Sequence, residues 1–118
     1  MANIFHILPR KDWEEAKKQG SYAPLTLKTE GFIHCSKADQ LLLVANSFFK
    51  GKDGLVILRI VEAKISSKLV YEIPKEAPQS TVKYPHIYGP LNLDAVEAVI
   101  SFPHRDDGRF DLPEDLLK

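Results

Sequence analysis

Histidines at the ends of apolar runs are the residues of this sequence best suited to do chemistry. His34 closes the run 31–33 and is followed two residues later by Ser36, a residue type that opens helices. His86 alternates with apolar residues just before Tyr88. An imidazole can donate to ribose or phosphate oxygens and can carry a positive charge, to which a helix N-terminus adds a partial one. We predict that these two strand ends present polar side chains to a cleft that favours an anionic or nucleotide-like ligand.

Two further side chains belong to the same pattern. His6 lies in the apolar run 4–8, so three of the four histidines share one local setting, and Tyr22 stands in a loop where its ring can stack on a flat ligand. Each candidate also has an ordinary structural interpretation. A strand histidine is often satisfied by a backbone carbonyl, Ser36 can serve only as a helix N-cap, and Tyr22 and Tyr88 can simply pack.

Several common site motifs are missing from the sequence. No two histidines have the close spacing of a zinc ligand pair, so no metal site is predicted. Ser36 lacks the Gly-x-Ser-x-Gly setting of a hydrolase nucleophile, and there is neither a Gly-x-Gly-x-x-Gly run nor a phosphate-loop lysine. The single Cys35 excludes an internal disulfide and is interpreted as a buried apolar thiol.

Length and charge narrow the class of protein. The 118 residues predict one domain spanning 1–118. The 16 basic and 16 acidic residues balance, so no global positive field favours nucleic acid as a partner. The N-terminus lacks the features of a signal peptide and the longest apolar run, 41–45, is far shorter than a membrane span, so we expect a cytoplasmic protein with no membrane partner. The oligomeric state is not predicted.

Apolar periodicity and turn residues indicate the elements that must hold these side chains. Residues 36–39 resemble a capping box, so a helix is expected to begin directly after Ser36. The run 55–61 is apolar except for Arg59 and is expected to be a central strand covered on both faces. The loop 74–83 is a candidate lid. The predicted elements are strands over 4–8, 31–34, 55–61, 68–73 and 96–102, helices over about 11–19 and 37–49, loops over 21–29 and 74–83, and a hairpin turn over 106–108.

The order of these elements, with helices early and strands late, predicts an α+β domain with a largely antiparallel sheet. Three runs and one tryptophan also resemble the domain-of-unknown-function-952 family, over nearly the whole chain: Ile-Phe-His-Ile at 4–7, Trp13, Gly-Phe-Ile-His-Cys-Ser at 31–36 and Pro-His-Ile-Tyr-Gly-Pro-Leu at 85–91. The resemblance implies an ADP-ribosyltransferase-like fold, in which two mostly antiparallel sheets and two N-terminal helices form a cleft that holds NAD.

The resemblance also implies roles for individual residues. A strand histidine, His34 or His6, would contact the ribose, and a tyrosine would stack on the nicotinamide. Glu72 is the one candidate for the glutamate of that superfamily, but it is expected to be exposed to solvent. The implied site has His34 and His86 as catalytic residues, and His6, Tyr22, Ser36 and Tyr88 as ligand-binding residues.

The implied activity is NAD-dependent ADP-ribosyl transfer or a related reaction on a small nucleotide-like ligand. Two alternatives remain at this stage. One is a nucleotide-binding module without chemistry, in which the same cleft recognises a ligand and releases it intact. The other is a protein-interaction domain in which the histidines are structural.

Overall fold

The described part of the chain, residues 2–75 and 78–117 of this computed structural model, folds as three small antiparallel sheets with three α-helices. The strands are β1 (Asn3–Pro9), β2 (Ser21–Tyr22), β3 (Ile33–His34), β4 (Leu55–Val61), β5 (Lys68–Glu72), β6 (Tyr84–Tyr88), β7 (Leu91–Asn92) and β8 (Val96–Ser101). The helices are α1 (Arg10–Gln19), α2 (Thr26–Thr29) and α3 (Leu41–Phe48), and short 3₁₀ helices span Glu62–Lys64, Leu93–Ala95 and Glu114–Leu117.

The central sheet has the order β1-β4-β8, and β4 confirms the predicted strand over 55–61. Its side chains alternate between two cores, because successive residues of a strand point to opposite faces of the sheet. Leu58 and Ile60 enter the first core and Ile57 the second, all fully buried. The sheet is therefore covered on both faces, as the strongly apolar run predicts.

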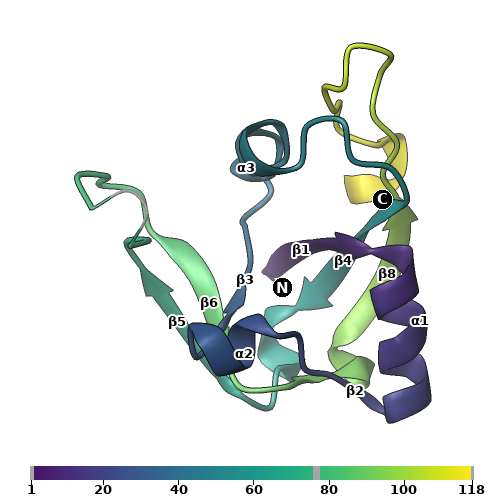
Figure 1. The fold of residues 1–118 in the computed structure, drawn as a ribbon. Helices are drawn as coiled ribbons and strands as arrows, with labels where there is room; N and C mark the ends of the chain where they lie inside the picture. The colour runs from purple at the N-terminus through teal and green to yellow at the C-terminus, as the bar shows by residue number, and fades with distance from the viewer. Residues whose placement is uncertain (1, 76–77, 118) are drawn as a thin grey trace.

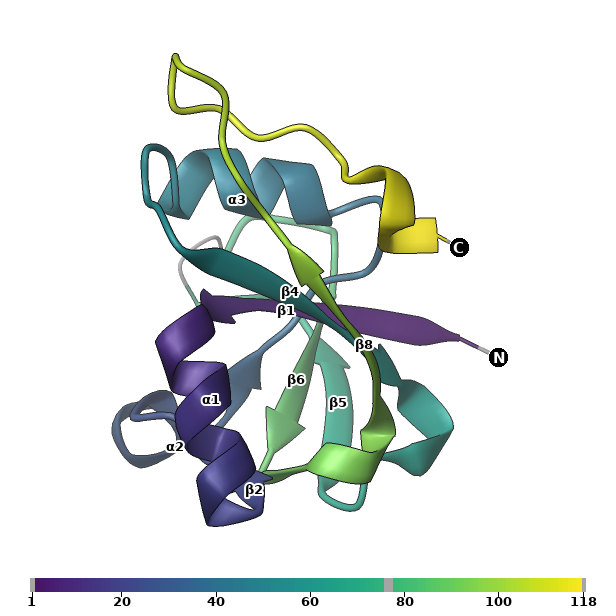
Figure 2. The ribbon, with the colours of Figure 1, turned by 90° about the vertical axis from the view of Figure 1, so that its right-hand side faces the viewer.

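Different elements complete the two cores. The first core contains Trp13 of α1 together with Ile33 and Ile87 of the sheet β3-β6-β5. The second contains Leu41 of α3 and Phe110 of the C-terminal segment. Figure 1 shows β5 and β6 standing apart from the central sheet, and Figure 2 shows α3 lying across one side of that sheet next to the C-terminal segment.

Helix α1 follows the prediction closely. Trp13 and Ala16, three residues apart, are its buried side chains. Gly20 ends the helix in the left-handed conformation, with φ 85°, and its N–H donates to the carbonyl of Ala16 at 2.9 Å. The predicted helix over 11–19 is thus confirmed, with Arg10 added at its start.

The expected helix start at Ser36 is wrong. The N–H of Ser36 donates to the carbonyl of Phe5, and the N–H of Phe5 donates to the carbonyl of Ser36, both at 2.8 Å. This bridge keeps Ser36 extended beside β1, so α3 begins only at Leu41. Phe48 continues the helical spacing of the buried residues Leu41 and Ala45, which indicates burial, but its side chain is 64% exposed.

The chain also differs from the predicted loops and from the expected number of sheets and helices. The expected loop over 21–29 contains β2 and α2, and β2 pairs with β7. The expectation of two sheets and two helices is therefore corrected to three of each in the described residues. The turn at 106–108 forms, with the N–H of Gly108 donating to the carbonyl of Arg105 at 2.8 Å, but no strand follows it in the described residues 109–117.

The candidate lid over 74–83 falls partly outside the described residues, at 76 and 77. Its described remainder carries no helix or strand. Among the helices described, none is long and apolar enough to cross a membrane.

Candidate functional site

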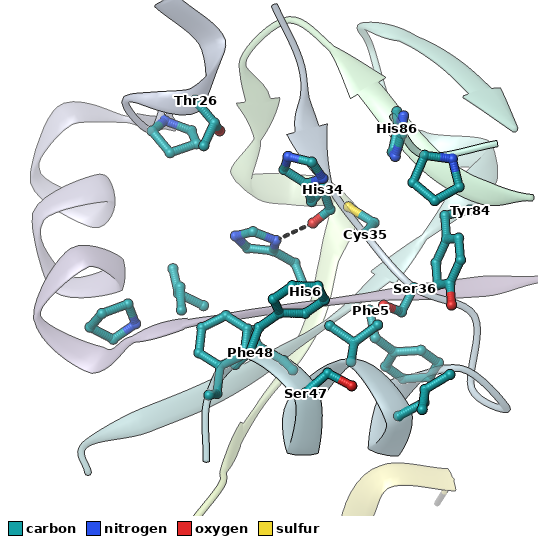
Figure 3. Close-up of a pocket in the computed structure, with 18 of the residues that line it drawn as sticks. Phe5, His6, Thr26, His34, Cys35, Ser36, Ser47, Phe48, Tyr84 and His86 are labelled. Atoms are coloured by element: carbon teal, nitrogen blue, oxygen red, sulfur yellow. Dashed lines mark hydrogen bonds between the residues drawn. The ribbon is translucent and has the colours of Figure 1, made fainter. Parts of the chain in front are cut away.

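A cleft of about 620 Å³ runs along β1, which is an edge strand of the central sheet. Helix α3 lines one side of it and strands β3 and β6 line another, as Figure 3 shows. Its polar lining comes mainly from histidine, serine and tyrosine, and none of the described residues that line it is Lys, Arg, Asp or Glu. The lining includes His6, Tyr22, His34, Ser36, Tyr84 and His86.

His34 and His86 lie side by side in this cleft. They are direct partners in the antiparallel pair β3–β6, and their ring centroids are 5.4 Å apart with an angle of 75° between the planes. Phe32 stacks on His86, with ring centroids 4.1 Å apart, and also contacts the ring of His34. The structure therefore brings the two predicted catalytic histidines within reach of one ligand, while their catalytic roles stay predictions.

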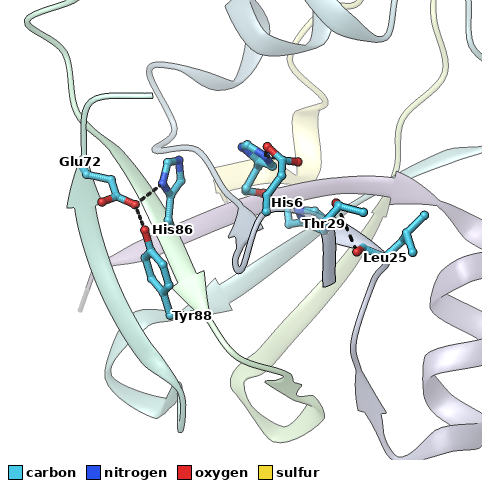
Figure 4. A network of polar contacts seen from close by, with 8 residues as sticks. His6, Leu25, Thr29, Glu72, His86 and Tyr88 are labelled. Atoms are coloured by element: carbon cyan, nitrogen blue, oxygen red, sulfur yellow. Dashed lines mark hydrogen bonds and ion pairs between the residues drawn. The ribbon is translucent and has the colours of Figure 1, made fainter. Parts of the chain in front are cut away.

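Glu72 is not among the predicted site residues, but it contacts two of them, His86 and Tyr88, directly. Its Oε1 accepts a hydrogen bond from Nδ1 of His86 at 2.7 Å and another from the hydroxyl of Tyr88, as Figure 4 shows. The hydrogen bonds from Tyr88 and His86 lower the pKa of the Glu72 carboxyl, and the bond to Glu72 raises the pKa of Tyr88. The side chain of Glu72 is 33% exposed while that of His86 is only 2% exposed. A partly exposed carboxylate thus fixes the orientation of a buried imidazole through a hydrogen bond.

A second carboxylate stands next to His34. Both carboxylate oxygens of Glu30 lie 3.1 Å from Nε2 of His34. The two side chains are about 40% exposed, so this pair lies closer to solvent than the Glu72–His86 pair. Each imidazole of the pair in the cleft therefore has its own carboxylate partner.

His6 and Tyr22 line the cleft but bond to their own surroundings. A carbonyl can only accept, so Nδ1–H of His6 donates to the carbonyl of His34 at 2.6 Å, which leaves Nε2 to accept from the hydroxyl of Tyr22 at 2.8 Å. Burial lowers the pKa of His6 to about 4 and raises that of Tyr22. His6 is therefore a neutral bridge that ties β1 to β3 and β2, and both its ring nitrogens are already occupied.

The remaining predicted residues differ in their position. Ser36 lines the cleft and is 4% exposed, but it does not lie at a helix N-terminus, so it offers no free helix N–H groups. Cys35 is buried, as predicted, and burial raises the pKa of its thiol, although it also lines the cleft. Tyr88 is 38% exposed and does not line the cleft, but it contacts the site through its hydrogen bond to Glu72 and its ring contact with Phe32, at 5.3 Å between centroids.

No group of three or more His, Cys, Asp or Glu side chains that could hold a metal ion occurs among the described residues. The carboxylate pairs of His34 and His86 are therefore interpreted as hydrogen-bonded pairs and not as metal ligands. In chemical terms they orient two imidazoles beside an otherwise uncharged cleft.

Comparison with known proteins finds solved structures with a similar architecture and a matching family. The crystal structure of protein CC0527 from Caulobacter crescentus is 28% identical, with a TM-score of 0.86 and coverage of 98% of this chain and 99% of that one. A crystal structure of a double mutant of CC0527 gives the same values, and its solution NMR structure is 29% identical over 92% of this chain and 91% of that one, with a TM-score of 0.78. No curated protein matches the chain. The model of the family "Protein of unknown function (DUF952)" matches residues 7–99, and the chain belongs to that family.

Proposed function

We propose that the cleft binds a small nucleotide-like molecule, with NAD or an ADP-ribose-like group as the leading candidate. The observation that supports this is the meeting of His34, His86 and Ser36 in one cleft with apolar and aromatic walls. Its volume of about 620 Å³ lies within the usual range for small-molecule sites.

The two ends of the cleft suit different parts of such a ligand. On the α3 side, Val44 and Phe48 line it and can cover a flat base or a nicotinamide ring. On the strand side, the imidazoles of His34 and His86 can form hydrogen bonds with a sugar. The ADP-ribosyltransferase-like arrangement belongs to this proposal, with the sheets β1-β4-β8 and β3-β6-β5 on either side of the ligand.

Within this proposal, binding ranks ahead of ADP-ribosyl transfer. Breaking the nicotinamide–ribose bond builds positive charge on the sugar, which an enzyme must stabilise. Glu30 and Glu72 are the nearby carboxylates, but neither lines the cleft, and each is hydrogen-bonded to an imidazole. A transfer reaction would have to rely on His34 and His86 themselves.

Calorimetric titration with NAD, ADP-ribose and 2′-phosphorylated nucleotides tests this function. His34→Ala removes one polar contact with the ligand. The affinity of the variant for the nucleotide should therefore fall by roughly one to two orders of magnitude, as expected for the loss of a strong hydrogen bond. The fold should survive because the His34 side chain is 37% exposed. His104→Ala is the matched control, since His104 is a histidine that does not line the cleft.

Release of free nicotinamide from NAD, followed by chromatography, separates transfer or hydrolysis from simple binding. A folded wild-type protein that binds none of these compounds at millimolar concentration would overturn the proposed function. The second candidate, a protein-interaction domain, would then gain weight. The observation that favours it is the exposure of Leu43 and Phe48, 65% and 64%, beside the same cleft.

A further inference from the structure

The hydrogen bonds to the two carboxylates fix which nitrogen of each cleft imidazole carries a proton. An ionised carboxylate only accepts hydrogen bonds. Nδ1 of His86 must therefore be the protonated nitrogen facing Glu72, and in a neutral imidazole Nε2 is then an acceptor. For His34 the assignment is reversed: Nε2 faces Glu30 and carries the proton, which leaves Nδ1 as the acceptor.

These two acceptors have no partner within the described part of the protein. No hydrogen bond between described residues involves Nε2 of His86 or Nδ1 of His34, whereas both nitrogens of His6 and of His104 are engaged. Both His34 and His86 line the cleft. Their ring centroids are 5.4 Å apart, so two hydroxyl groups on adjacent carbon atoms of one sugar can each reach one of the two rings.

The charge of the surroundings decides what kind of group these acceptors favour. No described Lys or Arg lines the cleft, and each of the two imidazoles is hydrogen-bonded to a carboxylate. A phosphate needs donors and positive charge, whereas a neutral diol needs only acceptors. The backbone N–H of Ser36 is already bonded to the carbonyl of Phe5, so it is not a donor for an anion either.

We infer that His34 and His86 form an acceptor pair that recognises the cis-diol of a ribose, with Glu30 and Glu72 as the positioning residues that set the two tautomers. The inference rests on the proposed function and names the part of the nucleotide that the strand side of the cleft reads. Phosphates would lie away from the two imidazoles, and a sugar lacking one of the two hydroxyls would leave one acceptor unpaired.

Nuclear magnetic resonance of the ligand-free protein, labelled with ¹⁵N in histidine, tests the tautomers first. At pH 8, long-range ¹H–¹⁵N spectra distinguish a protonated ring nitrogen from an unprotonated one. His86 should carry its proton on Nδ1 and His34 on Nε2, opposite tautomers in adjacent residues of the sheet. A proton on Nε2 of His86 or on Nδ1 of His34 would overturn the inference, whatever the protein binds.

The same spectra then test the diol with methyl β-D-ribofuranoside, which carries neither base nor phosphate. It should shift the unprotonated nitrogens of His34 and His86 and leave His104 unchanged. The 2-deoxy counterpart should bind at least about tenfold more weakly, since one hydrogen bond is lost. Equal binding of the two sugars, or no shift with either, contradicts the inference. AMP and 2′-deoxy-AMP should differ in the same sense.

Glu72→Gln separates positioning from packing. Glutamine has nearly the same shape, but its amide can donate as well as accept, so the tautomer of His86 should become mixed. The affinity for methyl β-D-ribofuranoside should fall in proportion to the share of the competent tautomer, about twofold for an equal mixture. Glu15→Gln, on the exposed face of α1, is the matched control and should change neither. An unchanged His86 tautomer in folded Glu72→Gln would contradict the role of Glu72. If the sugar binds with the predicted preference but no nucleotide binds, the proposed function fails and the diol site is supported. If nucleotides bind equally well with and without the 2′-hydroxyl, the proposed function is supported and the diol site fails.

Discussion

At the scale of single residues, His6 links folding to pH. Its pKa falls from 6.5 in the unfolded chain to about 4 in the folded protein, because its ring is buried. As the pH drops through 6.5 the unfolded state takes up a proton that the folded state refuses, so the free energy of unfolding decreases until about pH 4. Between pH 7 and pH 5 this loss should reach about 1–2 kcal/mol, because the ring also borders the cleft and is only partly withdrawn from solvent.

Urea unfolding of wild type and His6→Gln at both pH values measures this loss. Glutamine can still donate to the carbonyl of His34 and accept from Tyr22, but it does not titrate, so the variant should lack this part of the pH dependence. His104 has a raised pKa and contributes with the opposite sign, yet equally in both proteins. Glu72, whose pKa is lowered, loses its contribution only below its ordinary value of 4.5. Parallel pH dependence in the two proteins would contradict the assignment to His6.

Individual side chains also show how far the sequence can predict the site. The prediction for His34 and His86 rests on their positions next to short apolar runs, which depend only on local sequence. The contact between His86 and Glu72 cannot be predicted in this way, because Glu72 lies in another strand and is a diagonal neighbour of His86. His86 pairs with Val70, two residues before Glu72, so the contact follows only once the register is known.

At the scale of elements, the turn between β6 and β7 requires glycine. Gly89 has φ 148°, and a Cβ at this position would lie 2.5 Å from Oγ of Ser67. That hydroxyl cannot move freely, because it donates to the carbonyl of Pro90 at 2.7 Å. Gly89→Ala should therefore lower the free energy of unfolding by about 2 to 4 kcal/mol, from backbone strain of about 1–3 kcal/mol plus the lost contact.

Gly54→Ala is the matched control for this turn. Gly54 also has a positive φ, 72°, but a Cβ added there would meet nothing within 4 Å, so only the backbone strain should remain. Thermal or urea unfolding of the two variants measures the difference. Equal losses of stability in both would show that the contact with Ser67 contributes nothing.

The start of α3 shows why element boundaries were harder to predict than element types. The helical stripe of apolar residues and the residue preferences of Ser36 are local signals, and they agree on a helix from residue 37. The bridge between Ser36 and Phe5 joins residues 31 positions apart and overrides them. The side chain of Gln40 then accepts from the N–H of Lys37 at 2.9 Å and donates to the carbonyl of Lys83 at 2.8 Å, which holds the segment before the helix.

At the scale of the whole molecule, the α+β class and the central strand β4 followed from composition and periodicity. The division into three sheets did not, because β2, β3 and β7 are only two residues long and carry no periodic signal. The small sheets are stable only through the cores they share. Ile33 and Ile87 of β3 and β6 are fully buried in the same core as Leu58 of β4.

This shared core predicts that the molecule unfolds in one step. Trp13 is the only tryptophan and lies in the first core, so its fluorescence reports on the α1 side, while circular dichroism reports on all the strands. Ile87→Ala, in the sheet β3-β6-β5, should cost about 2–5 kcal/mol and shift both urea transitions by the same amount. If the dichroism transition moved and the Trp13 transition did not, the sheet β3-β6-β5 would be an independently unfolding unit, and the cleft between it and β1 could open without loss of the central sheet.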